Sequence, residues 1–213
     1  MLFPGLVMPL HVFEDRYRSL VRHLMALPDG VRREFGVVAI RHGWEVASGS
    51  AAMTLYDVGC TAEVRDVVEH PDGRFDLVTV GRRRFSIRQI VSGMTPYLQA
   101  DVEYLNDSAS VDMEADQLGP QVLASLRTYL DLLRTDGSRN GEQLPEDPYV
   151  LSHLVAATMS LSIEDRQALL AAPDATARLR AELTLLHREI GLLRHVRAVP
   201  VAISELPVHP GPN

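Results

Sequence analysis

The feature that most constrains the fold is a change in the spacing of apolar residues close to residue 106. Upstream of it, short segments alternate apolar and polar residues, which is the period of strands with one buried face. Downstream, apolar residues recur every three or four positions, as in amphipathic helices. This order predicts an α+β fold with a β unit at 1–108 and an all-α unit at 109–199, followed by a Pro-rich tail at 200–213 that we expect to be disordered.

The β unit is expected to be a curved antiparallel sheet or a small closed barrel with one helix, at about 14–27. Its most specific local signal is Pro71-Asp72-Gly73, because Asp-Gly readily adopts the positive φ angles of a tight hairpin turn. The uninterrupted apolar run at 35–40 predicts a strand buried on both faces. The other expected strands are 60–69 with a bulge at 66–68, 74–80 ending in a turn at Gly81, 82–91, and 97–105 with one buried face.

The second half predicts a bundle of helices. An apolar stripe over 118–133 marks the first helix, although Gly119-Pro120 must kink it or mark its true start. The last helix begins near Asp174 and carries an apolar seam, which we expect to pack in the core and to leave room for a homodimer surface. Between these helices the sequence predicts a polar loop at 135–148, a helix at 149–159 and a capped helix start at Ser162.

The absence of lysine excludes several kinds of catalysis. All 21 basic residues are arginine, so a P-loop, Schiff-base chemistry and a Ser-Lys dyad are ruled out. Guanidinium cannot replace the amine because it stays protonated. The net charge of -7 counts against nucleic acid as a partner, although the first half is close to neutral.

Other catalytic and metal-binding patterns are missing as well. The eight histidines show no metal-ligand spacing, and we expect neither a metal nor another cofactor. Cys60 is the single cysteine and is expected to be a small buried residue. The sequence shows no signal peptide and no membrane-spanning run, which favours a cytoplasmic protein without a membrane partner.

Four segments carry a resemblance to a known family. They are LFPGLVMPLHVFEDRYRSLV at 2–21, LYDVGCTAEV at 55–64, PDGRFDLVTVGRRRF at 71–85 and PYLQADVEYL at 96–105. Their order and spacing resemble the N-terminal domains of Lon proteases, and the helical segment at 161–190 looks like the closing helices of that family. Family members usually have one more strand before the Phe-Pro-Gly element, so an edge strand is expected either to be missing or to precede Met1.

The resemblance implies a PUA-like pseudo-barrel followed by a helical bundle that ends in a long helix. It also implies a stand-alone, non-catalytic module that binds unfolded or extended polypeptide and acts as an adaptor, with Lon or other protease machinery as a potential partner. An open sheet edge or a crevice between the two units would hold the peptide. The apolar residues that we expect near this crevice are Phe3, Leu6, Phe13, Tyr17, Tyr56, Phe85 and Tyr97.

Two other functions remain open at this stage. A PUA-like fold and the run Arg82-Arg83-Arg84 suggest RNA binding, with Arg82 and Arg84 as phosphate contacts, because guanidinium donates paired hydrogen bonds to phosphate. A hydrolase is the third alternative, but no catalytic residues can be assigned, since no nucleophile can be paired with a base.

Overall fold

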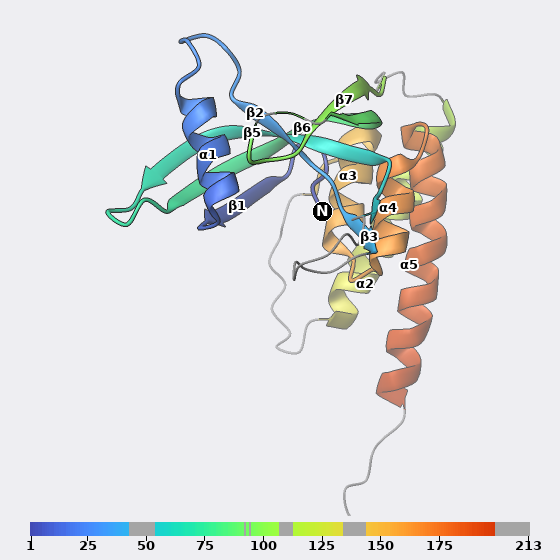
Figure 1. Ribbon diagram of the computed structural model, residues 1–213. Helices are drawn as coiled ribbons and strands as arrows, with labels where there is room; N and C mark the ends of the chain where they lie inside the picture. The colour runs from blue at the N-terminus through green and yellow to red at the C-terminus, as the bar shows by residue number, and fades with distance from the viewer. Residues whose placement is uncertain (43–53, 92, 94, 107–112, 134–143, 199–213) are drawn as a thin grey trace, which may run out of the picture.

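The computed structural model describes residues 1–42, 54–91, 93, 95–106, 113–133 and 144–198. Figure 1 shows two units beside each other, one made of strands with helix α1 (Asp15–Met25) and the other a bundle of helices. The bundle consists of α2 (Met113–Leu133), α3 (Pro148–Thr158), α4 (Ile163–Ala171) and α5 (Ala175–Ala198). The predicted α+β class is confirmed, and the tail at 200–213 lies outside the described residues.

The strand unit is an open antiparallel sheet, not the closed barrel that the sequence left as one alternative. The sheet runs in the order β1-β6-β5-β2, and β7 pairs with the second half of β6. A separate two-stranded sheet pairs β3 with β4. The bounds are Val7–Val12 for β1, Glu34–Val37 for β2, Ile40–His42 for β3, Thr54–Leu55 for β4, Val58–Glu69 for β5, Phe75–Val91 for β6 and Gln99–Tyr104 for β7.

The longest strand, β6, contradicts the predicted turn at Gly81. It continues through this residue, so the expected strands 74–80 and 82–91 are one element. Gly81 is needed for close approach, because a Cβ there would lie 2.1 Å from the carbonyl oxygen of Phe3. Its N–H donates to the Leu6 carbonyl at 2.9 Å, and its carbonyl accepts from the Gly5 N–H at 2.9 Å. The glycine therefore fixes the N-terminal segment against β6.

The hairpin turn is confirmed. Gly73 has a φ of 78°, and the N–H of His70 donates to the Arg74 carbonyl at 2.8 Å across the turn. The bulge expected at 66–68 lies slightly earlier, between Val64 and Asp66 of β5.

Two strand predictions are wrong. The run at 35–40 is divided between β2 and β3, in different sheets, and its residues are half-buried or exposed rather than buried on both faces. Strand β7 has no buried face, because all of its residues are exposed. An apolar run or an alternating pattern shows that a segment can form a strand, but it does not show whether another part of the protein covers that strand.

The helix starts follow local capping signals. Asp147 accepts from the Val150 N–H at 3.0 Å, Ser162 from the Asp165 N–H at 3.0 Å and Asp174 from the Ala177 N–H at 2.7 Å. Helix α2 begins at Met113, so Gly119-Pro120 lies inside it and does not mark its start. The seam of α5 packs in the bundle core, where Leu179 and Leu186 are fully buried.

The two units are joined by apolar packing and by buried polar side chains. Phe3, which is 1% exposed, packs in a cluster with Ala156, Leu169 and Leu170 of the bundle. From β6, the Arg84 guanidinium donates to the carbonyls of Leu170 at 2.6 Å and Ala172 at 2.5 Å. From α4, the Gln167 amide donates to the Val58 carbonyl at 2.9 Å.

Candidate functional site

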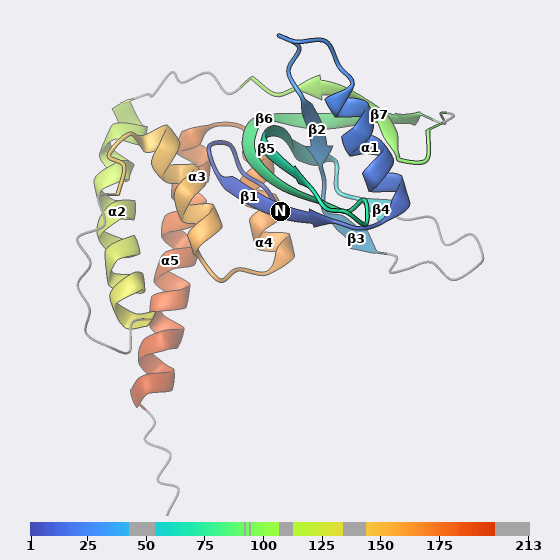
Figure 2. The same cartoon turned by 90° about the vertical axis from the view of Figure 1, so that its left-hand side faces the viewer.

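The two faces of the sheet formed by β1, β6 and the end of β5 differ in what covers them. Helix α1 lies over one face, where Val21 packs with Phe75 and Leu77 (Figure 2). The opposite face, which we call the outer face, carries the alternate side chains of the same strands, and these are exposed apart from the half-buried Val80. Because side chains alternate across a strand, burial of one face determines which residues the other presents.

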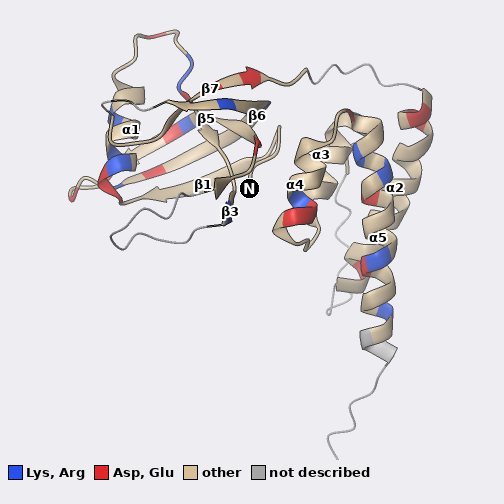
Figure 3. Ribbon diagram, turned by 45° about the vertical axis from the view of Figure 1, so that its right-hand side comes forward, with Lys and Arg blue, Asp and Glu red and all other residues tan. Residues whose placement is uncertain are grey.

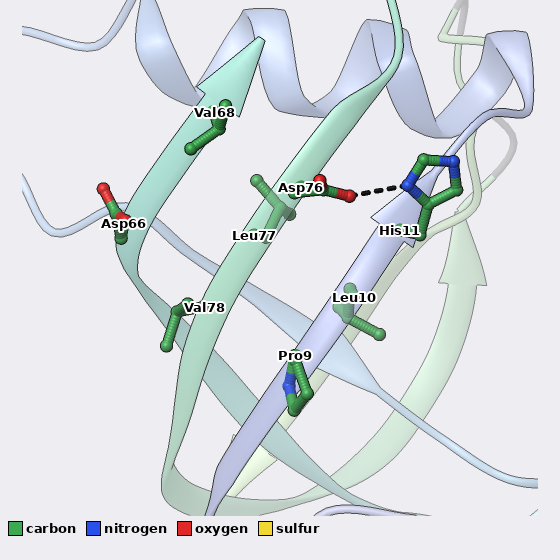
Figure 4. Close-up of a pocket in the computed structure, with 8 residues that line it drawn as sticks. All are labelled: Pro9, Leu10, His11, Asp66, Val68, Asp76, Leu77 and Val78. Carbon is green, nitrogen blue, oxygen red and sulfur yellow. Dashed lines mark hydrogen bonds and ion pairs between the residues drawn. The ribbon is translucent and has the colours of Figure 1, made fainter. Parts of the chain in front are cut away.

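The outer face is largely apolar. In the strand register, Val7 lies opposite Val80, Pro9 opposite Val78 and His11 opposite Asp76. Val7 is 64% exposed, Val68 50% and Val78 39%. A shallow depression of about 380 Å³ lies here, between the three strands (Figure 4). Its lining residues are Pro9, Leu10, His11, Asp66, Val68, Asp76, Leu77 and Val78.

Strand β1 is an edge strand. It pairs with β6, and no second partner strand is present among the described residues. Since Gly81 is hydrogen-bonded to Leu6, antiparallel alternation directs the backbone groups of Val7, Pro9 and His11 away from β6. Pro9 has no N–H, so this free edge offers the N–H groups of Val7 and His11 together with the intervening carbonyls.

A polar cluster closes one end of the outer face. His11 Nδ1 lies 2.6 Å from Asp76 Oδ1, and His70 Nε2 lies 2.7 Å from Asp76 Oδ2. Figure 4 shows the contact between His11 and Asp76 beside the apolar residues. These hydrogen bonds, with His11 the larger contributor, hold the pKa of Asp76 below its usual value, so the carboxylate stays ionised.

The seven residues predicted to form one crevice are separated by the structure. Phe3, Tyr56 and Phe85 are buried and fill the core. Leu6 is half-buried and packs beside the Phe3 cluster. These four residues support the fold, and the three buried rings have no surface to offer a ligand.

The other three lie near helix α1. Phe13 is 62% exposed and stacks near the ring of His11, with 6.3 Å between the ring centroids. Tyr17 is 42% exposed and lies under the Arg16 guanidinium. Tyr97 is half-buried, with its hydroxyl 2.7 Å from His23 Nδ1. Of the predicted set, Phe13 is therefore the residue that adjoins the outer face.

The arginine run does not present two phosphate contacts. Arg84 is 1% exposed and its guanidinium donates to main-chain carbonyls of the bundle, so that it cannot reach a phosphate in this conformation. Arg82 pairs with Glu63 at 2.9 Å and Arg83 with Glu34 at 3.1 Å. Figure 3 shows acidic and basic residues interspersed along the strands rather than a field of one sign.

Sequence reasoning missed both main features of the outer face. In β1 and in the first part of β6, exposed apolar residues alternate with half-buried or buried apolar residues. Both faces of these strands are therefore apolar in the sequence, which does not indicate which face the rest of the protein covers. The polar cluster joins residues from β1 and the β5–β6 hairpin that are up to 65 positions apart, and only strand register brings them together. The Pro-Asp-Gly turn was the one available signal for the register of the hairpin.

Taken together, these features define an α+β domain in which an open sheet with an exposed apolar face is fixed to a helical bundle. The chain belongs to the family described as the ATP-dependent protease La (LON) substrate-binding domain, which it matches over residues 1–188. The match therefore concerns the substrate-binding domain of Lon and not its protease domain. No described helix is both long and apolar enough to cross a bilayer.

Named relatives and solved structures agree with this assignment. The chain is 29% identical over 207 residues to Lon protease 2 of Myxococcus xanthus and 30% identical over 207 residues to Lon protease of Anaeromyxobacter dehalogenans. In both cases the match covers 95% of this chain and 24% of the relative, so the chain spans about a quarter of their length.

The fold is shared with the Lon N-terminal domain protein from Xanthomonas campestris, with a TM-score of 0.61 at 24% identity, covering 86% of this chain and 91% of that one. It is also shared with the N-terminal domain of the Mycobacterium avium complex Lon protease, with a TM-score of 0.62 at 20% identity, covering 88% and 92%.

Proposed function

We propose that this domain binds extended, apolar segments of polypeptide on the outer face and along the free edge of β1, without cleaving them. The observation that carries the proposal is the row of exposed apolar side chains beside a strand edge with which none of the described strands pairs. A guest strand could pair with the backbone groups of Val7 and His11, with its side chains beside Val7 and Pro9. A polypeptide segment that continues across the strands would then cover Val78 and Val68. The family description supports polypeptide as the ligand class.

Phe13 extends this surface beyond the end of β1. Its exposed ring lies beside His11, and a flat aromatic side chain offers a large contact area to apolar residues of many shapes. Tyr17, in the first turn of α1, would add a second ring with a hydroxyl group. Such a surface has few fixed polar contacts, so binding is expected to be weak and tolerant of sequence.

The proposal of binding without cleavage rests on the chemistry of the chain. Without lysine it has no Ser-Lys dyad, and no described serine is paired with a histidine and a carboxylate in the arrangement that acyl transfer requires. We further propose that bound polypeptide is passed to Lon or a related protease, for which the relatives' names are the support.

The test is titration of a labelled, permanently unfolded model protein into the purified domain, with binding followed by fluorescence anisotropy. Val78 is 39% exposed, so covering it contributes about 1 kcal/mol, and replacing it by Glu also places in the middle of the outer face a charge that a bound apolar segment would have to desolvate. V78E should therefore weaken binding at least about tenfold.

The matched control is V102E in β7. Val102 is 37% exposed and Val78 is 39% exposed, so both variants add the same charge at a similar surface position of the sheet. V102E should leave affinity within about twofold, a change of less than about half a kcal/mol. Equal losses in V78E and V102E, or no wild-type binding at high micromolar concentration, would refute the proposal. Circular dichroism establishes that both variants are folded.

A further inference from the structure

We propose that His11, His70 and Asp76 form a binding site for a divalent transition-metal ion of the zinc type, which fastens edge strand β1 to the tip of the β5–β6 hairpin. The inference stands independently of polypeptide binding. It rests on three side chains that the strand register brings together from separate parts of the chain.

The geometry of the cluster suits a small ion. One ligand atom from each of the three residues lies within 4.8 Å of the others. Zinc with bonds of about 2.0–2.1 Å to nitrogen and oxygen places its ligand atoms roughly 3.3 Å apart. The hydrogen bonds of His11 and His70, at 2.6 and 2.7 Å, reach different oxygens of Asp76. For an ion held by one of these oxygens, the pair that already contacts it opens slightly, and the other separations, all within 4.8 Å, need to close.

The chemistry of the cluster also suits zinc. Two imidazole nitrogens and a carboxylate oxygen are the borderline ligand set that zinc and its neighbours in the periodic table accept. The side chains of His11 and Asp76 are 47% and 50% exposed, and that of His70 is 36% exposed, so an ion can enter and the side chains can adjust. Asp76 supplies the negative charge, and the ion would replace the protons that now bridge it to the two rings.

Position explains what an ion would do there. His11 belongs to β1 and Asp76 to β6, where they are register partners, while His70 stands at the turn that follows β5. An ion bound to all three would tie the edge strand to both strands of the hairpin. Since β1 is held by β6 alone among the described strands, this attachment would oppose fraying of the edge.

Arg74 is the residue that works against the ion. Its Nη1 lies 3.4 Å from His11 Nε2, which accepts when the ring carries its proton on Nδ1. If the ion binds His11 through Nδ1, the ring carries its proton on Nε2 instead, so that the N–H groups of His11 Nε2 and Arg74 Nη1 would face each other. Arg74 also donates to Asp72 at 2.7 Å, and this contact can hold the guanidinium after it turns away from His11.

The experiment is calorimetric titration of ZnCl₂ into tag-free protein that has been treated with a chelator and dialysed. One equivalent should bind, and H11A, H70A and the shape-preserving D76N should each weaken binding at least about tenfold. The control is H23A, because His23 lies in α1 outside the cluster, and its affinity should stay within about twofold.

A second readout does not depend on the variants' stability. Zinc added to the wild type should shift the ring resonances of His11 and His70 in an NMR spectrum and leave those of His23 unchanged. R74Q should tighten binding about two- to fivefold, the range of one exposed charge interaction. Equal or weaker binding by R74Q would contradict coordination through His11 Nδ1. Wild-type binding no tighter than that of H11A and H70A would overturn the site.

Discussion

The buried Arg84 offers the most direct test of how the two units are held together. Its guanidinium donates to the carbonyls of Leu170 and Ala172 at the end of α4, and hydrogen bonds from a charged group contribute about 1.5–3 kcal/mol each. R84M keeps the aliphatic stem and removes both bonds. The carbonyl of Ala172 is near the surface and can turn to water, so we expect a loss of about 3 kcal/mol in the free energy of unfolding.

The neighbouring residue provides the control for this substitution. Arg83 has a side chain that is 47% exposed, pairs with Glu34 and lies over the ring of Tyr104. The Glu34 side chain is 19% exposed, so the pair is partly buried, and together with the contact to Tyr104 it contributes about 1–2 kcal/mol. R83M should therefore cost less than R84M. Urea unfolding followed by far-UV circular dichroism measures both variants. If R84M is no less stable than R83M, then the contacts of Arg84 do not join the units and the reasoning fails.

Two further predictions concern the backbone and pH. G81A should lower stability by several kcal/mol in thermal unfolding, because its Cβ would lie 2.1 Å from the Phe3 carbonyl oxygen. G191A, whose Cβ would have no atom within 4 Å, should raise stability by roughly 0.5–1 kcal/mol. Equal effects of the two substitutions would contradict the close approach at Gly81. Burial, followed by the charges of Arg178 and Arg84, lowers the pKa of His153 to about 2, so the unfolded chain takes up a proton below about pH 6.5 and the native state does not. In urea unfolding, the wild type should therefore lose stability relative to H153L as pH falls from 6.5 towards 4, a comparison in which the opposite contribution of Glu182, whose pKa is raised by burial, cancels. A difference between the two proteins that does not change with pH would rule out this role of His153.

The features that the sequence predicted correctly depend on neighbouring residues. The Asp-Gly hairpin, the helix at α1 and the cap at Ser162 are each determined within a few positions, by turn geometry or by a side chain that satisfies a free N–H. The change in apolar spacing predicted strands followed by helices, and the resemblance to a known family implied the same order. Neither source contained the pairing of β6 with both β1 and β7.

The features that the sequence did not predict depend on contacts between distant segments. Gly81 looks like a turn residue, yet its role is set by the Phe3 backbone lying against it. Arg84 stands in a charged run that is typical of a surface, and its burial follows from carbonyls more than eighty positions away. The cluster of His11, His70 and Asp76 likewise has no recognisable spacing, because its ligands are neighbours only through strand register.

The insertion of Phe3 into the bundle has a consequence for how the protein can be made. Phe3 completes a core whose other members, Ala156, Leu169 and Leu170, are synthesised about 150 residues later. Fragments expressed separately would each expose apolar surface that only the other can cover.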